Sequence, residues 1–419
     1  MSWDYLTNLL GIGGDFKVAD VKIKQLDHRN AVIIRLERIN KTESCCSGCG
    51  QIVAKVTAYR RRQVQHLTLW EHLTFLEFME YRVICPDCGL KVETLPWIER
   101  YARVTKPLAC QVAELCKVMS NKAVSAFERL DWDTVKEIDK RAIHRAQAAR
   151  PLDGITILGV DEIAVGRGHN YWHMVSAMDG PRGAELLYIG EGRKEKDLEG
   201  FWRWFGKQRA TRITYAVMDM WKGFIKSFRV HCPGIVLIYD KFHVIRHLLE
   251  ALNQVRKQEL RRARGRFHGL LAGKKFILLS RRAHVRGESR QALNQLLGFS
   301  KKLMKAYFLK ESFGHLWGYR SKTWGRKFFT SWVQDLRWSR LKPYQQFAGM
   351  IERHLDGILA CGDKKVSLGF IEATNLHAKN IIRRAYGYRD KEYMKLKIIQ
   401  ACSHLGEFHP WRYSFNNSS

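Results

Sequence analysis

The chain of 419 residues carries 72 Lys plus Arg against 41 Asp plus Glu, a formal net charge of +31. Its hydrophobic content of 46% can fill several cores, so the composition excludes an intrinsically disordered protein. No apolar run reaches the length of about 18 residues that a membrane span needs, and the N-terminus lacks the basic start and apolar core of a secretion signal. We expect a cytoplasmic protein with no membrane partner, and the excess positive charge predicts nucleic acid as its partner.

Residues 1–44 show one strand-like segment, VIIRLER (32–38), and are followed by two closely spaced cysteine pairs. The first pair stands in CCSGCG and the second in ICPDCG; the four residues are Cys46, Cys49, Cys85 and Cys88. Each pair precedes a glycine, which lets the backbone turn so that both thiolates face one ion, and four thiolates form the usual tetrahedral site for structural zinc. Cys45 in place of Cys46, or redox-active or incidental cysteines, are the alternatives.

The residues between the two pairs read as short strands, so that this module resembles a zinc ribbon. The predicted strands are 52–59, 65–78 and 80–85.

Between residues 103 and 150 the apolar residues recur three and four apart, which predicts helices. The predicted helical segments are 108–119, 121–130 and 131–147. Asp131 or Asp133 is expected to cap the third of these helices. A short helix, a tight break and a helix rich in cations are typical of a helix-turn-helix domain, with a plain three-helix bundle as the alternative. The cations expected to contact DNA are Lys136, Lys140 and Arg141.

After Pro151 the pattern becomes α/β and predicts three successive strands, a helix, and two further strands that alternate with helices. The strands are expected at 155–165, 171–179, 185–192, 213–220 and 235–240, and the helices at 196–208 and 221–229. This order of elements describes a ribonuclease-H-like sheet, in which the first and fourth strands lie side by side.

Two carboxylates end these neighbouring strands, Asp161 on the first and Asp219 on the fourth, 58 residues apart in sequence. Carboxylates held close together repel each other and favour a cation between them. Mg²⁺ (or Mn²⁺) is the expected ion, since it prefers oxygen ligands and supports phosphodiester displacement. Glu162 is expected to point to the opposite side of the strand, and Asp240 is the alternative ligand.

A third carboxylate, Glu372, lies in a predicted helix near the C-terminus. Asn375, Lys379 and Arg383 follow at spacings of three, four and four, so one face of this helix would present a metal ligand, an amide and two cations. This arrangement suits a DNA backbone beside a metal ion.

The intervening segment 241–345 carries 25 Lys or Arg against 5 Asp or Glu and is predicted to be helical. Its tryptophans are either stacking surfaces for unpaired bases or, as is more common in helices, core residues. They are Trp317, Trp324, Trp332 and Trp338. His243 and His247 are four residues apart, which favours helix packing or phosphate contact over a metal site because no matching ligand is near in sequence.

Taken together, these segments resemble the ISL3 insertion-sequence transposases, which are of the DDE type. The resemblance rests, in chain order, on the CSGC and CPDC pairs, LGVDEIAVGRGHNY, VMDMWKGF, IYDKFHVIRHL and GFIEATNLHAKNIIRRAYGYRD. It implies that Asp161, Asp219 and Glu372 are the catalytic triad. It also implies that a zinc ribbon and a helix-turn-helix domain recognise the terminal inverted repeats of the element.

The expected fold is therefore multidomain, with α+β and α/β parts. It comprises an N-terminal region with a zinc ribbon (1–100), a helix-turn-helix-like domain (101–150), a ribonuclease-H-like catalytic core (151–240 and 361–405) and a basic helical insertion (241–360).

The leading hypothesis is a nucleoid-associated DNA transposase that cleaves the ends of its element and transfers the strands to target DNA. Because two ends are handled together, a homodimer or larger complex is expected. A ribonuclease-H-like structure-specific endonuclease and a non-catalytic DNA-binding regulator are the alternatives.

Overall fold

The computed structural model describes residues 4–12, 14–26, 29–166, 168, 170–262, 273–337, 339–360, 369–385 and 389–409. The chain forms two compact units, Met1–Ala149 with Leu405–Ser419, and Arg150–His404. No helix among the described residues is long and apolar enough to cross a membrane.

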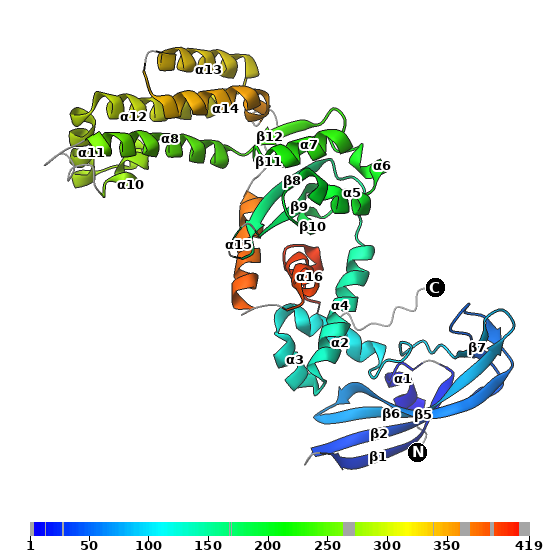
Figure 1. The fold of residues 1–419 in the computed structure, drawn as a ribbon. Coiled ribbons are helices and arrows are strands. Elements are labelled where there is room, and N and C mark those ends of the chain that lie inside the picture. Colours follow the sequence, from blue (N-terminus) through cyan, green and yellow to red (C-terminus); the bar gives the residue numbers. More distant parts are fainter. Residues whose placement is uncertain are drawn as a thin grey trace. The chain divides into compact units, whose positions relative to one another are not determined.

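The first unit opens with helix α1 (Asp4–Leu9) and is built on a five-stranded sheet (Figure 1). Its strands are β1 (Phe16–Leu26), β2 (Arg29–Arg38), β5 (Val56–Leu69), β6 (His72–Cys85) and β7 (Gly89–Val92). The order is β1-β2-β6-β5, with β7 paired to β6; β2 and β6 are parallel and the other pairs antiparallel. One face of the sheet is apolar and packs around Phe16, Phe78 and Trp97, whose rings meet edge to face.

Sequence analysis missed one strand of this sheet and joined two others. Strand β1 was not predicted, although its FKVADVKIKQL alternates apolar with polar residues over much of its length, the pattern of a strand with one face open to solvent. The predicted strand 65–78 is two strands, since the chain turns at Trp70 and Glu71 to join β5 to β6 as a hairpin. Trp70 adopts a left-handed φ of 53° without the Gly or Asn that usually marks such turns.

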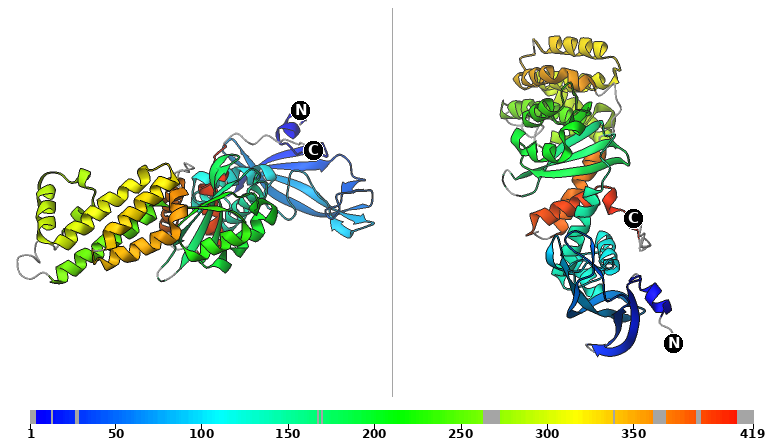
Figure 2. Two further views of the ribbon diagram at one scale, coloured as in Figure 1. Left: turned by 90° about the horizontal axis from the view of Figure 1, so that it is seen from above. Right: turned by 90° about the vertical axis from the view of Figure 1, so that its right-hand side faces the viewer.

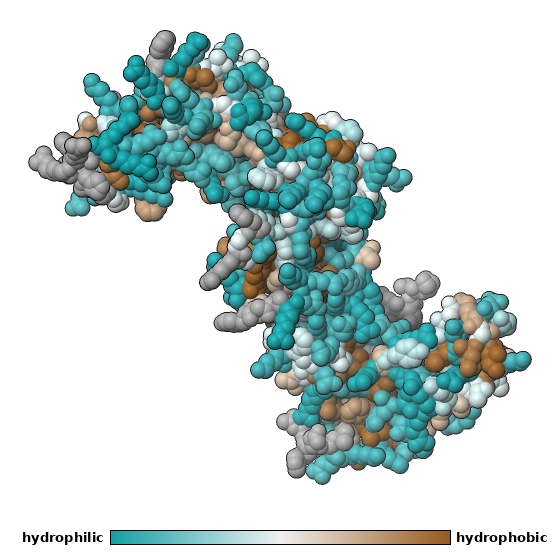
Figure 3. Space-filling view, viewed as in Figure 1, coloured by the Kyte–Doolittle hydropathy of each residue, from teal (hydrophilic) through white to brown (hydrophobic). Residues whose placement is uncertain are grey.

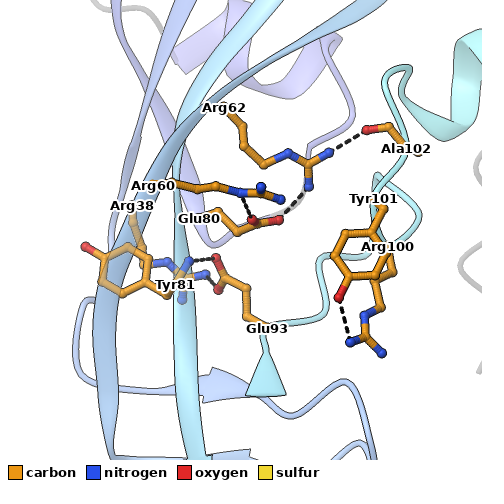
Figure 4. A network of polar contacts seen from close by, with 9 residues as sticks. All are labelled: Arg38, Arg60, Arg62, Glu80, Tyr81, Glu93, Arg100, Tyr101 and Ala102. Carbon is orange, nitrogen blue, oxygen red and sulfur yellow. Dashed lines mark hydrogen bonds and ion pairs between the residues drawn. The ribbon is translucent and has the colours of Figure 1, made fainter. Parts of the chain in front are cut away.

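A cluster of ion pairs within this sheet is linked by a hydrogen bond to the segment that follows the sheet (Figure 4). Glu80 on β6 accepts hydrogen bonds from Arg60 at 2.7 Å and from Arg62 at 2.5 Å. Arg62 also donates to the carbonyl of Ala102. Glu80 is almost fully buried, so its charge requires these partners, and the arrangement holds the chain near residue 102 against β5.

Three helices complete the first unit, as predicted: α2 (Lys106–Val118), α3 (Asn121–Glu128) and α4 (Trp132–Ala148). They enclose a small core that includes Leu108, Val112 and Val135. Asp131 is the N-cap residue of α4, as expected, but its side chain makes no capping hydrogen bond.

The second unit contains a five-stranded sheet in the order β10-β9-β8-β11-β12 (Figure 1). Its strands are β8 (Ile157–Ala164), β9 (Tyr171–Gly180), β10 (Gly183–Glu191), β11 (Tyr215–Met218) and β12 (Val236–Tyr239). Strand β9 is antiparallel to both β8 and β10, whereas β11 is parallel to both β8 and β12. The prediction that the first and fourth strands are adjacent is confirmed.

One face of this sheet packs on the apolar sides of α5 and α7, through residues such as Phe201, Phe205 and Phe228. The helices on the chain between β10 and β12 are η1 (Glu195–Leu198), α5 (Glu199–Phe205), α6 (Lys207–Ala210) and α7 (Lys222–His231). The single helix predicted over 196–208 is therefore wrong. Gly206, with φ 88°, separates α5 from α6.

The segment after β12 is helical, as predicted. It comprises α8 (Lys241–Arg262), α10 (Lys275–Leu279), η2 (Arg282–His284), α11 (Gly287–Phe299), α12 (Lys301–Phe313), η3 (Gly314–Gly318), α13 (Lys322–Arg337) and α14 (Lys342–Leu359). Helices α12 and α14 each pack against α8 (Figure 1), and Figure 2 shows this helical segment from two further directions. The face of these helices seen in Figure 3 is largely hydrophilic.

The tryptophans of this segment serve mainly as core. Trp332 is 2% exposed and packs against Phe313, and Trp317 packs against the same core. Trp324 is 59% exposed, and Trp338 lies outside the described residues. Trp324 is thus the most exposed of the three described tryptophans in this set, and Lys327 lies over its ring, 4.7 Å from the centroid.

Helices α15 (Gly369–Arg384) and α16 (Lys391–Ala401) follow, and α16 packs against β10. The last helical turn is η5 (His404–Gly406).

Candidate functional site

The four predicted zinc ligands meet in the first unit. The hairpin of β3 (Ser44–Cys45) and β4 (Ile52–Val53) carries one pair, and the β6–β7 turn carries the other. Ligand atoms of Cys46, Cys49, Cys85 and Cys88 all lie within 4.8 Å of one another. Cys45 is outside the cluster and donates to the carbonyl of Gly50 at 3.2 Å, so Cys46 is the cysteine that joins the site.

Glycines make the two cysteine turns possible. Gly50 and Gly89, each directly after a cysteine pair, have φ values of 78° and 71° that favour glycine. At Gly48 a Cβ atom would lie 2.8 Å from the sulfur of Cys88, so only glycine fits there. The backbone N–H groups of Gly48 and Cys49 lower the pKa of Cys46 to about 7. Backbone amides thus favour the thiolate form that binds a metal.

The predicted catalytic residues come together in the second unit. A cavity of about 270 Å³ is lined at its polar positions by Asp161, Asp219, Asp240, His243, Glu372, Asn375 and Lys379. These residues come from β8, from the ends of β11 and β12, from the start of α8 and from α15. Asp161 lies within β8, which continues to Ala164, and not at the strand end as predicted. The cavity therefore joins segments that are more than 200 residues apart in sequence.

Strand register explains why two of the carboxylates meet. Val160 on β8 is paired with Met218 on β11, so Asp161 and Asp219 are the next residues of two adjacent parallel strands. Asp219 accepts the backbone N–H of Met220 at 2.6 Å. Burial raises the pKa of Asp161, and the nearby Asp219 raises it further. Such repulsion between buried acids is what a bound cation relieves.

Helix α15 reaches β8 because position 159 has no side chain. A Cβ atom there would lie 2.7 Å from Cδ1 of Ile371 and 2.9 Å from Sδ of Met178. Ile371 directly precedes Glu372, so this close approach places Glu372 at the cavity. Asn375, one turn further along the helix, donates from Nδ2 to Oδ2 of Asp161 at 2.5 Å.

The predicted polar face of α15 is thus only partly at the site. Glu372, Asn375 and Lys379 line the cavity, whereas Arg383 is exposed on the same helix and is not among the lining residues. Within the described ranges, only the four cysteines are drawn together to 4.8 Å. The three acids therefore share the cavity without their oxygens being in mutual contact.

Glu162 and the two histidines agree with their sequence predictions. His243 lines the cavity, and its Nδ1 lies 3.2 Å from Oδ2 of Asp240, which raises the pKa of His243. His247 instead lies beside Glu250 at 3.4 Å, so the two histidines do not form a metal pair. Glu162 does not line the cavity and accepts a hydrogen bond from Arg193, a residue that sequence analysis did not single out. The spacing Asp240-x-x-His243 at a strand–helix junction was the available signal for His243.

The predicted DNA-binding cations lie on α4. Lys136 lies over the ring of Trp132, 5.6 Å from its centroid, and Lys140 is half-buried on the same helix. Arg141 pairs with Glu99 at 3.1 Å, and Arg145 pairs with the same carboxylate. One of the three predicted cations, Arg141, is thus already paired within the protein.

Three family models of known proteins match parts of the chain. A transposase domain model of the ISL3 type matches residues 158–398. The helix-turn-helix domain of transposase family ISL3 matches 93–143, and the zinc-finger of transposases IS204, IS1001, IS1096 and IS1165 matches 42–88.

Whole proteins agree with these matches. The chain is 30% identical to the transposase for insertion sequence element IS1001 of Bordetella parapertussis, over 85% of this chain and 88% of the relative. It is 26% identical to the transposase for insertion sequence element IS1557 of Mycobacterium tuberculosis, over 92% of each chain.

The class of protein is therefore a transposase, an enzyme that carries a DNA-binding helix-turn-helix domain and a zinc ribbon. The chain belongs to the ISL3 family of transposases, and the resemblance noted in its sequence is confirmed. The zinc-ribbon match and the four-cysteine cluster together support structural zinc.

Proposed function

We propose that the protein cleaves DNA at the terminal inverted repeats of an insertion sequence and transfers the freed 3′ ends to target DNA. The single observation that carries this proposal is that Asp161, Asp219 and Glu372 line one cavity from three separate elements. We propose these residues as the catalytic triad on a ribonuclease-H-like core, with Mg²⁺ or Mn²⁺ as the ion they hold. Three carboxylates are an oxygen donor set that suits either ion.

The residues around the triad have distinct tasks. When bound, the divalent ion supplies positive charge that activates the attacking water or hydroxyl and stabilises the leaving oxygen. Asn375 orients the Asp161 carboxylate by donating a hydrogen bond to Oδ2. The other oxygen, Oδ1, accepts the backbone N–H of Glu162 at 2.8 Å. Lys379 at the same cavity provides a cation for the phosphate next to the cleaved bond.

The rest of the chain supplies DNA binding and assembly. We propose that the regions 1–100 and 101–150 recognise the terminal repeats, that 151–240 with 361–405 forms the catalytic core, and that 241–360 contacts the bound end. Lys136 and Lys140 on α4 and Arg383 on α15 are proposed backbone contacts. A homodimer or larger complex brings two ends together at the nucleoid.

The test is a cleavage and strand-transfer assay with duplexes that carry the terminal repeats found beside the coding region. Asp161→Asn, Asp219→Asn and Glu372→Gln should each abolish Mg²⁺-dependent cleavage and leave binding to the repeat unchanged. Asp335→Asn, which removes an exposed carboxylate on α13, is the matched control and should cleave normally. Normal cleavage by Asp161→Asn would refute the triad. Cleavage without any joined product would indicate a nuclease instead of a transposase.

A further inference from the structure

A second polar cleft, of about 550 Å³, lies entirely within the first unit. It is formed by strands β5 and β6, the segment before α2, and the turn that joins α3 to α4. Its lining residues are Gln63, Gln65, Phe75, Arg103, Arg129, Leu130, Asp131 and Thr134. Two arginines thus face a cleft that holds one carboxylate.

Both arginines are available to a ligand. Arg103 and Arg129 are exposed, and among the residues that the structure describes neither side chain has an ion-pair or hydrogen-bond partner. Arg141 on α4 differs, because its guanidinium is paired with Glu99. A guanidinium with no internal partner binds phosphate without first giving up another contact. The uncompensated charge near the helix-turn-helix therefore lies at the cleft as well as on α4.

A single residue of β5 holds both arginine-bearing segments. The backbone N–H of Gln65 donates to the carbonyl of Arg103 at 3.0 Å. The side-chain Nε2 of Gln65 donates to the carbonyl of Glu128, the residue directly before Arg129, at 2.8 Å. Both segments are thereby fixed to one strand, so the distance between the arginines is set before any ligand binds, which reduces the entropic cost of binding.

The backbone at Arg129 does not explain why an arginine stands there. Arg129 is the C-cap residue of α3 in the left-handed conformation, with φ 53° and ψ 46°. Glycine is the residue that adopts this conformation at least cost, and a residue with a Cβ is disfavoured there by about 1 kcal/mol. The side chain, which reaches the cleft, is what distinguishes arginine from glycine at this position.

We propose that this cleft binds the sugar–phosphate backbone of duplex DNA, with Arg103 and Arg129 each contacting a phosphate. The inference rests on the proposed function, in which this unit binds the terminal repeats. It assigns contact with the DNA backbone to the cleft at the start of α4, in addition to Lys136 and Lys140 on that helix. Contacts of this kind fix the register of the protein on DNA without reading sequence.

The test measures binding of the full-length protein to a terminal-repeat duplex and to a scrambled duplex of equal length, by fluorescence anisotropy over a range of salt concentrations. Arg129→Gly is the most informative variant, because it removes the cation while placing the preferred residue in the left-handed conformation. We expect a melting temperature no lower than that of the wild type. We also expect affinity for both duplexes to fall about three- to tenfold, with the salt slope reduced by about one phosphate contact.

Two further variants complete the test. Arg103→Gln should have the same effect as Arg129→Gly. Lys207→Gln, which removes an exposed cation on α6, outside the regions proposed to contact the repeats, is the matched control and should bind normally. Wild-type affinity and salt slope in both arginine variants would overturn the cleft assignment while leaving the proposed function intact. Equal binding of the wild type to both duplexes would instead count against recognition of the terminal repeats.

Discussion

Arg193 donates from Nη1 to Oε1 of Glu162 at 3.0 Å, and this contact links the chain segments that carry Asp161 and Asp219. The guanidinium lies 4.3 Å from the ring centroid of Trp221, whose Nε1 donates to the carbonyl of Arg193 at 2.7 Å. Glu162 is the neighbour of Asp161, and Trp221 follows Asp219 by two residues. Arg193 therefore contacts both of the chain segments that carry the carboxylates Asp161 and Asp219.

Replacement of Arg193 is expected to weaken the metal site. Arg193→Gln removes the ion pair and the contact with the ring, each worth about 1 kcal/mol at a partly exposed site. We expect the cleavage rate to fall about tenfold or more, because small displacements of catalytic groups are costly, and the Mg²⁺ concentration at half-maximal rate to rise. Mg²⁺ titration of cleavage measures both.

The control for this prediction is Arg209→Gln, which removes an arginine paired with the exposed Asp153 at 3.6 Å. It should leave the Mg²⁺ dependence unchanged. Arg193→Lys keeps the charge but not the planar group that lies against the ring, and should give an intermediate result. An unaltered Mg²⁺ dependence in Arg193→Gln would show that Arg193 does not position the carboxylates.

The close packing of α15 on β8 predicts that Gly159→Ala is damaging. The new methyl group would overlap Ile371 and Met178, and overpacking of this kind destabilises by about 1–3 kcal/mol. Displacement of α15 moves Glu372, so we expect cleavage to fall about a hundredfold. Thermal unfolding and cleavage assays measure the two effects.

Gly349→Ala is the matched control for this helix packing. Gly349 lies within α14, and a Cβ atom added there would lie 3.8 Å from Nη1 of Arg353, the flexible end of that side chain. Alanine should stabilise this helix by about 0.5–1 kcal/mol and leave cleavage unchanged. Full activity in Gly159→Ala would mean that the position of Glu372 does not depend on this contact.

The cysteine cluster predicts that zinc stabilises the first unit. Cys85 is 2% exposed and its sulfur lies 3.6 Å from that of Cys49. Cys85→Ser or a strong chelator should release zinc and lower the unfolding temperature, since metal binding and folding are coupled. Zinc content by atomic emission and thermal unfolding report the change. Cys45→Ser should retain one zinc per chain, and loss of zinc in that variant would place Cys45 among the ligands.

Sequence reasoning was most successful where one periodic pattern or one spacing determined the outcome. The two cysteine pairs predicted the four-cysteine cluster. The order of the predicted strands, which was read from the apolar runs that contain or precede Asp161 and Asp219, predicted that β8 and β11 are adjacent. The meeting of these residues with α15 depends on Gly159, whose role is visible only once Ile371 is seen to lie against it.

Residues that act through long-range contacts were not predictable in the same way. Arg193 lies in a loop between β10 and η1 with no motif of its own, and its partners Glu162 and Trp221 are 31 and 28 residues away. The pairing of Arg141 with Glu99 was also hidden, since a cation on a helix has the same sequence pattern whether or not a carboxylate faces it. The partners of Arg193 and Arg141 are determined by the packing of segments that are distant in sequence.

Asp240 provides the last prediction, because it also ends a strand at the cavity and is the alternative metal ligand. Its Oδ1 accepts the backbone N–H of Phe242 at 2.7 Å, and its Oδ2 lies 3.2 Å from Nδ1 of His243. A carboxylate with both oxygens engaged is less free to bind an ion than Asp219, which among the described residues accepts one hydrogen bond, from the backbone N–H of Met220. Asp240→Asn should therefore reduce cleavage about ten- to a hundredfold, as expected of a residue that supports a metal site. Asp219→Asn should leave no measurable cleavage. If Asp240→Asn were as inactive as Asp219→Asn, with unchanged thermal stability, Asp240 would be a direct ligand.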